Sequence, residues 1–389
     1  MMKIHRALIL ILTFCFLFST FFIPVQAEEH QSLSPSLSAK SALLMEAESG
    51  AVVLEKNAHT RLPMASTTKI MTSLVALELA APDTLIQVDN RAVGIEGSSI
   101  YLCEGEELTL EELLYALMLE SANDAAVAIA IGVAGSEEAF VNAMNAKAVS
   151  LGLTNTHFAN PHGLDAEMHY TTAYELAVIA RAALQNPLLK NIVSTRKTTI
   201  SHQDTDGVRL LVNHNKMLRL YDGCIGVKTG YTQKSGRCLV SAANRDGVTM
   251  IAVTIDSPDD WNDHTKLLDF GFANYRSVEL CPADFRLCIP VVGGKETYLM
   301  LGVAQSFSVT LPLNAGVIEQ KIECQRHLYA PIKEGDVCGR MLFLCDTNGD
   351  AIKETIGDIP LIAQYSIQRY SPQLSLWQRF LRWWRGLFS

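Results

Sequence analysis

The order of strand and helix patterns along the chain is the feature that most constrains its fold. Apolar and polar residues alternate on either side of Ser49-Gly50, over residues 42–57, which predicts a β-hairpin. Helical patterns fill the middle of the chain, and strand patterns return over residues 224–257. Strands on both sides of a helical segment predict one α/β domain, in which the N-terminal and C-terminal strands share a sheet.

The helical patterns have recognisable ends. Thr109 with Glu112 three residues later forms a capping-box pattern at the start of the segment that runs to Ser121. Two further patterns, residues 123–135 and 136–152, each close on a glycine, and residues 171–184 form another. Residues 196–213 then predict a second hairpin, before three strands in residues 224–257.

The composition is that of a folded protein. Of 389 residues, 49% are apolar and 19% are charged, which argues against disorder. The net charge of -9 makes the chain mildly acidic, so nucleic acid is excluded as a partner for the chain as a whole. The length allows a large core and more than one domain.

The N-terminal segment is typical of an export signal. Lys3, His5 and Arg6 precede an apolar stretch over residues 7–22, and Val25 and Ala27 give a cleavage-site pattern. We therefore predict a signal peptide over residues 1–27 and a linker over residues 28–38. A retained membrane anchor is the alternative, although the apolar stretch is short for a spanning helix.

The C-terminal third differs in character from the rest. Residues 278–367 are rich in strand patterns and predict a small all-β domain. Residues 371–389 predict an amphipathic helix that lies in a membrane interface, or alternatively one that packs on its own protein. One half of its helical wheel holds Trp377, Phe380, Leu381, Trp383, Trp384, Leu387 and Phe388, and the other half holds Gln378, Arg379, Arg382 and Arg385.

The cysteines are consistent with an oxidising compartment. Cys15 leaves with the signal peptide, and the even number that remains predicts some disulfide pairing. Cys224 and Cys238 flank one predicted strand and its turn, and a turn centred on Tyr231 would bring them face to face. We therefore predict a disulfide between them. A metal site is the alternative, but neither the cysteine spacing nor the histidines support one.

A polar segment, Ser66 to Lys69, stands at the start of an apolar helical pattern that ends at Ala80. Residues three apart on a helix share a face, so the lysine amine can reach the serine hydroxyl. A serine needs a base to take its proton, and a lysine becomes that base when burial and nearby positive charge lower its pKa. We interpret Ser66 as a nucleophile and Lys69 as its base, with Thr67 and Thr68 as filler.

Two other segments suit this chemistry. Lys228, Thr229 and Gly230 follow a predicted strand, and the cation and hydroxyl fit a substrate carboxylate. Gly230 lacks a side chain where a substrate backbone could lie alongside. Ser121 and Asn123 lie between two predicted helices, where a hydroxyl and an amide can relay a proton and hold a peptide carbonyl.

The order of the three segments carries the argument, because each segment alone is weak. A serine with a lysine three residues later occurs again at Ser194 and Lys197. That copy lies in a strand-like stretch, where residues three apart point to opposite faces, so we interpret it as incidental. All three patterns in order are typical of class A β-lactamases and penicillin-binding proteins.

The sequence resembles the D-alanyl-D-alanine carboxypeptidases, which are low-molecular-mass penicillin-binding proteins of bacterial cell walls. The resemblance covers residues 39–275 and includes the three motifs and residues 97–126, 159–173, 213–218 and 236–247. Ala122 departs from it, since the family more often has glycine there. It implies a β-lactamase/transpeptidase-like domain, an antiparallel sheet flanked by helices, followed by a small all-β domain and a membrane-anchoring helix.

The resemblance also implies a reaction. Ser66 would attack the penultimate D-Ala of a peptidoglycan stem peptide and form an acyl-enzyme, with Lys69 as general base. Ser121 would pass the proton to the leaving D-Ala, supported by Lys228. Water would then hydrolyse the ester without a metal or cofactor, and β-lactam antibiotics would acylate Ser66 as substrate mimics.

The substrate contacts are implied in the same way. Thr229 and Lys228 would bind the terminal carboxylate of the peptide, and Asn123 would bind a peptide carbonyl. The backbone N–H groups of Ser66 and Tyr231 would hold the oxyanion. His162 and Asp165 also suggest a Ser-His-Asp arrangement, but we favour a structural loop for them because Lys69 already supplies a base.

Other functions fit the sequence less well. A class A β-lactamase needs an acidic residue for deacylation, and no Glu-x-x-Leu-Asn pattern lies between Asn123 and Lys228. A non-catalytic wall-binding protein would be expected to lose the motifs, and all three are intact. Housekeeping and sporulation-specific roles remain open. The protein is expected to act at the outer face of the cell membrane.

Overall fold

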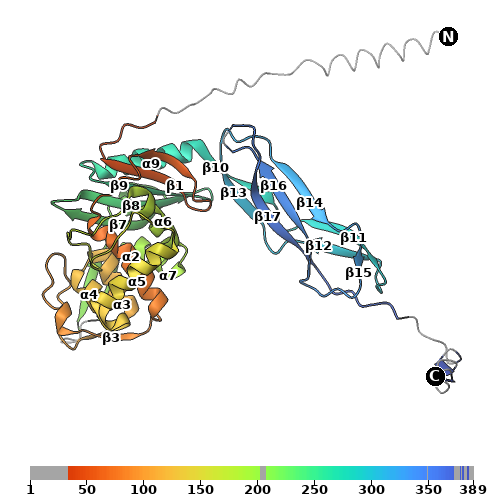
Figure 1. The fold of residues 1–389 in the computed structure, drawn as a ribbon, viewed down its shortest axis with the longest axis horizontal. Helices are drawn as coiled ribbons and strands as arrows, with labels where there is room; N and C mark the ends of the chain where they lie inside the picture. The colour runs from red at the N-terminus through yellow and green to blue at the C-terminus, as the bar shows by residue number, and fades with distance from the viewer. Residues whose placement is uncertain are drawn as a thin grey trace, which may run out of the picture. The chain divides into compact units, whose positions relative to one another are not determined.

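The computed structural model describes residues 34–201, 207–347 and 349–371, and five residues beyond them: Trp377, Arg379, Phe380, Trp383 and Trp384. Figure 1 shows the fold of these parts. The predicted signal peptide, residues 1–27, lies outside the described residues, as does the start of the linker.

A five-stranded antiparallel sheet organises the first domain, with the strand order β2-β1-β9-β8-β7. The strands from the two ends of the domain therefore pair with each other, which confirms the predicted shared sheet. The strands are β1 (Ser41–Glu46), β2 (Val52–Lys56), β7 (Cys224–Thr232), β8 (Gly236–Arg245) and β9 (Val248–Ile255).

Both faces of this sheet are buried, because successive side chains of its central strands enter different cores. Leu43 and Met45 of β1 join the larger core, and Ala42 and Leu44 join the smaller one. Helix α9 (Asp260–Asn274) covers the smaller core, and the helices that pack on the larger core lie on the opposite side (Figure 1). They include α2 (Lys69–Leu79), α4 (Asn123–Ala134), α5 (Glu137–Ser150), α6 (Ala173–Leu184) and α7 (Pro187–Ser194).

Shorter elements surround the helical layer. The predicted capping box is confirmed, because the Thr109 hydroxyl and the Glu112 carboxylate cap each other's backbone at α3 (Leu110–Tyr115). A π-helical turn, η3 (Ala116–Glu120), continues α3 and ends at Ser121. The remaining elements are η1 (Ala65–Thr68), η2 (Asn90–Ala92), α8 (Met217–Leu220), the pair β3 (Leu85–Gln87) and β4 (Glu107–Thr109), and the predicted hairpin of β5 (Lys197–Ser201) and β6 (Val208–Val212).

The second domain is all β, as predicted, and begins at Tyr275. Its six-stranded sheet has the order β14-β16-β17-β12-β11-β15, and a separate pair joins β10 to β13. The domain has its own core, built around Leu299, Leu301, Met341 and Leu361. The strands are β10 (Tyr275–Cys281), β11 (Arg286–Val292), β12 (Tyr298–Gly302), β13 (Phe307–Pro312), β14 (Glu319–Cys324), β15 (Leu328–Tyr329), β16 (Val337–Cys345) and β17 (Glu354–Ala363).

The described part of the C-terminal segment is helical, with Trp377 and Trp383 67% and 60% exposed. Most of residues 371–389 lie outside the described residues, so the amphipathic helix stays a prediction. In the described ranges no single helix is long and apolar enough to cross a membrane; α4 and α5 together meet that length and composition, with a bend of 87° between them.

The predicted Cys224–Cys238 disulfide is wrong. Cys224 pairs with Ala243 across the β7–β8 hairpin, and Cys238 pairs with Gly230. Ala243 lies five positions further along β8 than Cys238, which is about 16 Å of strand and far beyond the reach of a disulfide. Both cysteines carry free thiols, as do the other cysteines in the described part of the chain.

The position of the turn explains this error. The strands pair up to Thr232 and Gly236, so the turn lies after Thr232 and not at Tyr231. The Ser235 and Thr232 hydroxyls and backbones bond to each other across the turn, and Gly236 has a φ of 64° that favours glycine.

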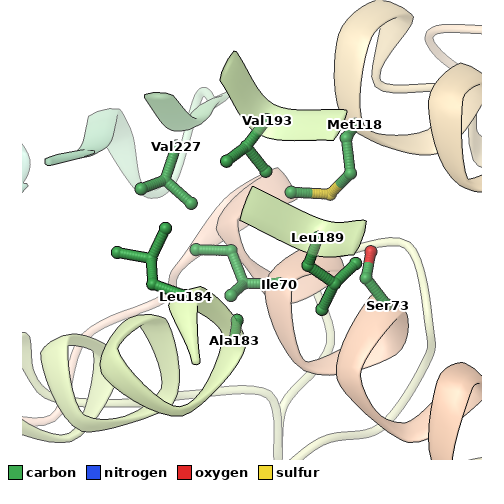
Figure 2. Close-up of a pocket in the computed structure, with 8 residues that line it drawn as sticks. All are labelled: Ile70, Ser73, Met118, Ala183, Leu184, Leu189, Val193 and Val227. Carbon is green, nitrogen blue, oxygen red and sulfur yellow. The ribbon is translucent and has the colours of Figure 1, made fainter. Parts of the chain in front are cut away.

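A small apolar cavity of about 10 Å³ lies behind the Ser66–Lys69 segment, lined by Ile70, Ser73, Met118, Ala183, Leu184, Leu189, Val193 and Val227 (Figure 2). The Ser73 hydroxyl does not need a hydrogen-bond partner inside the cavity, because it donates to the carbonyl of Lys69 at 2.9 Å. The cavity is a packing defect between α2, η3, α6, α7 and β7.

Truncation at this cavity is expected to destabilise the domain. Leu189 is 2% exposed, so Leu189→Ala would enlarge an existing void and remove buried apolar area. We expect a loss of about 2–5 kcal/mol in the free energy of unfolding, measured by urea titration. Leu220→Ala is the control, since Leu220 is 62% exposed and should change stability by less than about 0.5 kcal/mol. Equal losses in both variants would contradict this account.

Candidate active site

Ser66 lies in the 3₁₀ turn η1, directly before α2. The two threonines that follow it hold this turn: Thr67 Oγ1 donates to the Met64 carbonyl at 2.6 Å, and Thr68 Oγ1 donates to the Ala65 carbonyl at 2.8 Å. The interpretation of Thr67 and Thr68 as filler is therefore wrong. They bond back to the turn and present Ser66 at its corner.

A buried histidine supports the same turn. The backbone N–H of Ala159 donates to His169 Nδ1 at 3.0 Å, so Nε2 carries the proton and donates to Thr68 Oγ1 at 2.7 Å. Burial lowers the pKa of His169 to about 4, with smaller contributions from His157 and Lys69. His169 is therefore neutral at physiological pH and serves as a hydrogen-bonding strut.

Lys69 is fully buried, and its ammonium position is defined by three acceptors. Its Nζ lies 3.0 Å from Ser66 Oγ, 2.7 Å from Asn123 Oδ1 and 2.5 Å from the His162 carbonyl. Desolvation lowers its pKa well below 10.5, and the charge of Lys228 lowers it further, whereas Asp124 acts in the opposite direction. The amine can thus lose its proton and act as a base toward Ser66.

Lys228 acts on Lys69 from strand β7. It is 1% exposed, and its Nζ donates to the Thr229 carbonyl at 3.1 Å. Burial lowers the pKa of Lys228 to about 7, although the carboxylate of Glu120 opposes this shift. Lys228 is therefore only partly protonated near neutral pH. In its protonated form, its positive charge lowers the pKa of Lys69 and so favours the neutral Lys69 amine.

Ser121 and Asn123 come from the junction between η3 and α4. Ser121 has a left-handed φ of 62° and is 6% exposed. Asn123 begins α4, and its Nδ2 donates to the Glu96 carbonyl at 2.6 Å while its Oδ1 accepts from Lys69. The structure thus brings Asn123 into contact with Lys69, a contact that the sequence did not predict.

The loop of residues 160–165 forms the floor of the site. The His162 carbonyl accepts from Lys69, and the Pro161 carbonyl accepts from Thr72 at 2.6 Å. Gly163 has a φ of 94°, and a Cβ there would lie 2.1 Å from the Ala65 carbonyl oxygen. Only glycine fits this position, because the loop packs directly against the turn that carries Ser66.

The His162 imidazole contacts the loop and α5 rather than Ser66. Its Nδ1 accepts the backbone N–H of Leu164 at 3.2 Å, and its Nε2 lies 3.9 Å from Glu137. Burial, with the charge of Lys69, lowers the pKa of His162 to about 3. Asp165 accepts from Thr232 at 3.1 Å, which ties the loop to β7. The expected structural role of the loop agrees with these contacts.

Gly230 contributes through packing against the turn η1, which carries Ser66. A Cβ at Gly230 would lie 3.0 Å from the backbone nitrogen of Ser66 and 3.1 Å from the Ala65 Cβ. The absent side chain therefore lets β7 approach the backbone N–H of Ser66. From the sequence we expected the missing side chain of Gly230 to make room for a substrate backbone. We did not expect Gly230 to pack against η1.

An open cleft of about 390 Å³ gives access to Ser66. Its lining includes the expected Ser66, Ser121, Thr229, Gly230 and Tyr231, whereas Lys69, Asn123 and Lys228 lie behind that surface. Sequence reasoning missed the rest of the lining, which is Ser98, His214, Lys216, Arg237, Asp260 and Trp261. Four of them lie in sequence segments that resemble the family, and Asp260 and Trp261 begin α9. No local motif marks any of these residues as part of a site.

Comparisons with known proteins agree with this geometry. The family model described as D-alanyl-D-alanine carboxypeptidase matches residues 26–259, and that of the penicillin-binding protein 5 C-terminal domain matches residues 275–369. The chain is 34% identical to D-alanyl-D-alanine carboxypeptidase DacF of Bacillus subtilis over 82% of this chain and 84% of the relative. It is 31% identical to D-alanyl-D-alanine carboxypeptidase DacC of Escherichia coli over 97% and 96% of the two chains.

Solved structures are similar over the same range. Penicillin-binding protein 5 from Haemophilus influenzae is 26% identical and superposes with a TM-score of 0.65, covering 87% of this chain and 99% of that one. D-alanyl-D-alanine carboxypeptidase DacD from Francisella tularensis is 28% identical, with a TM-score of 0.61 and coverage of 87% and 95%. The buried Lys69 beside Ser66 and the two matched domains lead to one conclusion: the chain belongs to the D-alanyl-D-alanine carboxypeptidase family of serine peptidases.

Proposed function

We propose that this protein removes the terminal D-Ala from peptidoglycan stem pentapeptides through an acyl-enzyme on Ser66. The observation that carries the proposal is the buried Lys69 amine, 3.0 Å from Ser66 Oγ and with its pKa held well below the usual value. A neutral amine at hydrogen-bond distance is what a serine hydroxyl needs in order to become a nucleophile.

Acylation begins when Lys69 takes the proton of Ser66 and the alkoxide attacks the carbonyl of the penultimate D-Ala. The backbone N–H groups of Ser66 and Tyr231 hold the oxyanion, because two donors aimed at that oxygen stabilise the charge as it develops. Ser121, with Lys228 behind it, passes this proton on from Lys69 to the leaving D-Ala nitrogen, so that Lys69 is neutral again. The C–N bond breaks and an ester remains on Ser66.

Deacylation reverses the roles of base and acid. Water attacks the ester carbonyl while Lys69 accepts its proton, and the Ser66 oxygen leaves with a proton returned from the same amine. The shortened peptide is released as a carboxylic acid. Asn123 holds a peptide carbonyl in both steps, and Thr229 holds the terminal carboxylate with the positive charge of Lys228 behind it.

A β-lactam follows the first half of the same path. Its strained ring amide takes the place of the scissile peptide bond, so attack by Ser66 opens the ring and leaves the whole antibiotic on the serine. The leaving nitrogen stays tethered to the acyl group. Covalent labelling of Ser66 by penicillin is therefore part of the proposed activity.

The direct test is release of D-Ala from a peptide that ends in D-Ala-D-Ala. Purified protein is expected to release one D-Ala per peptide and to bind labelled penicillin covalently. Protein that does neither would overturn the proposed enzyme activity. Labelled penicillin that is hydrolysed rapidly, with no D-Ala release, would indicate a β-lactamase instead.

We also propose that the protein is exported and held at the outer face of the cell membrane by residues 371–389. The described aromatic side chains of this segment, Trp377, Phe380, Trp383 and Trp384, are between 45% and 67% exposed. Such rings need an apolar environment, and a membrane interface offers one to a helix with a basic opposite face.

Deletion of the chain from Ser371 tests this anchor. The truncated protein is expected to move from the membrane fraction to the soluble fraction, since most of the apolar area that would enter the interface is removed. D-Ala release should change little, because Ser66 and its partners lie in the first domain. Protein that still sediments with membranes would exclude residues 371–389 as the anchor.

A further inference from the structure

The position of the Ser121 hydroxyl depends on the backbone around it. Ser121 is 6% exposed and lines the cleft, but among the described residues no hydrogen bond is made to its Oγ. Its φ of 62° is a left-handed conformation, which costs free energy in a residue other than glycine. Such a conformation persists only where the surrounding structure holds it, so the contacts of the neighbouring residues decide where the hydroxyl lies.

Three contacts hold the two residues directly before Ser121. The π-helical turn η3 ends at Glu120, whose Oε1 accepts the backbone N–H of Val212 at 2.5 Å. His214 Nε2 lies 3.1 Å from Glu120 Oε2, and the backbone N–H of His214 donates to the Leu119 carbonyl at 3.4 Å. These contacts, which we call the Glu120–His214 clamp, join the end of η3 to the chain at the end of β6.

The clamp is built from strong bonds. An ionised carboxylate only accepts hydrogen bonds, so His214 Nε2 carries the proton that it shares with Glu120. The Glu120 side chain is 24% exposed, and hydrogen bonds to a carboxylate are about twice as strong as those between neutral groups. His214 lines the cleft together with Ser121. Loss of the clamp would therefore release the turn at the edge of the cleft.

Glu120 also provides a negative charge near the proposed proton relay. Its charge opposes the effect of burial on Lys228, whose pKa lies at about 7. Glu120 therefore favours the protonated form of the lysine that supports Ser121. The charges that shift the pKa of Lys69 come from Lys228 and Asp124, so Glu120 affects Lys69 only through Lys228.

We propose that Glu120 and His214 are positioning residues for the proton relay through Ser121. The inference rests on the proposed function and deepens it, because cleavage of an amide requires a proton on the leaving nitrogen. The clamp holds the turn that carries Ser121, and the Ser121 hydroxyl then lies where it can pass the proton from Lys69 to that nitrogen. Each of the two residues acts through Ser121 rather than on the reacting atoms.

Two substrates that differ only in the leaving atom provide the test. One peptide ends in D-Ala-D-Ala, and the other has D-thiolactate in place of the terminal D-Ala, so that sulfur replaces the scissile nitrogen. A thiolate leaves without a proton, whereas an amine does not. Glu120→Ala should lower kcat/KM for the amide about 10- to 100-fold, because a shift of about 1 Å in a catalytic group has an effect of that order. The thioester should change less than about threefold, since its cleavage does not use the relay.

Matched variants separate the clamp from general damage to the fold. Glu120→Gln should lie between wild type and Glu120→Ala, because its amide oxygen still accepts from Val212. His214→Gln should keep more activity on the amide than His214→Ala, since glutamine retains a donor toward Glu120. Glu55→Ala is the control: Glu55 lies 3.6 Å from His59 in a pair that does not line the cleft, and its loss should affect neither substrate.

The pH profile separates the relay from the base. A change in the charge of Lys228 would move the pKa of Lys69, and it would shift the profiles of amide and thioester alike because both substrates need Lys69. A misplaced Ser121 lowers the plateau of kcat/KM for the amide alone. We expect Glu120→Ala to show this lower amide plateau, whatever shift the two profiles share.

The outcomes distinguish this inference from the proposed function. A wild type that releases D-Ala, with a Glu120→Ala variant that keeps its full rate on the amide, would overturn the role of the clamp alone. Equal losses on amide and thioester at the plateau would also overturn it, since they indicate a general effect on the site. If Glu120→Ala does not fold, the same criteria apply to Glu120→Gln and His214→Ala. A wild type that is inactive on the amide would overturn the proposed function and this inference with it.

Discussion

Ser66→Ala is expected to abolish both D-Ala release and covalent penicillin binding. The hydroxyl that forms the ester is gone, and loss of the nucleophile in serine peptidases lowers kcat on the order of a million-fold. The fold should persist, because Ser66 Oγ bonds Lys69, and Lys69 keeps Asn123 and the His162 carbonyl as acceptors. Labelling with radioactive or fluorescent penicillin measures the loss directly.

The chain provides its own control for this substitution. Ser194 and Lys197 repeat the spacing of Ser66 and Lys69, but Ser194 ends α7 and its hydroxyl donates to the Asn191 carbonyl at 2.9 Å. Ser194→Ala should therefore retain full activity. Penicillin that still binds Ser66→Ala covalently, or activity that is lost in Ser194→Ala, would show that the nucleophile is assigned to the wrong residue.

Lys69→Met should lower the rate of acylation by a factor second only to that of Ser66→Ala. The methionine keeps the apolar stem and removes the amine that takes the Ser66 proton. General-base catalysis contributes about 10²- to 10⁴-fold, so acylation by penicillin should slow by about that factor. Stopped-flow or time-course labelling measures the acylation rate. Lys197→Met is the matched control, because Lys197 lies on the exposed side of β5.

The pH dependence of wild-type acylation separates a base from a merely structural lysine. Burial and the charge of Lys228 lower the Lys69 pKa well below 10.5, so the neutral, reactive amine forms as pH rises through that lowered value. The acylation rate should rise with pH and reach a plateau well below pH 10.5. A rate that keeps rising through pH 10.5, or one that is unchanged by Lys69→Met, would contradict the role of Lys69 as base.

Local sequence patterns predicted that Ser66 and Lys69 lie in contact, because that contact depends on short-range geometry. Ser66 and Lys69 need only one helical turn between them, and the structure places Nζ 3.0 Å from Oγ. The shared sheet was also predictable, since strand patterns stood at both ends of a helical segment. Each of these predictions depends on residues that are close in sequence or on the order of elements.

Contacts between distant segments were not predictable. Gly163 fits under Ala65 because two loops about 100 residues apart pack together, and no pattern in either loop reports that distance. Arg237 reaches Asp260 and Trp261 from a different element in the same way. The Cys224–Cys238 prediction failed for a smaller reason: the hairpin turns after Thr232, so the two cysteines are out of register.

The most direct test of the central claim is to identify the residue that penicillin modifies. The protein is incubated with penicillin, digested and analysed by mass spectrometry. We expect one adduct with the mass of the intact antibiotic, on Ser66 in the peptide that also contains Lys69. An adduct on another residue, or none on protein that releases D-Ala, would contradict an acyl-enzyme on Ser66.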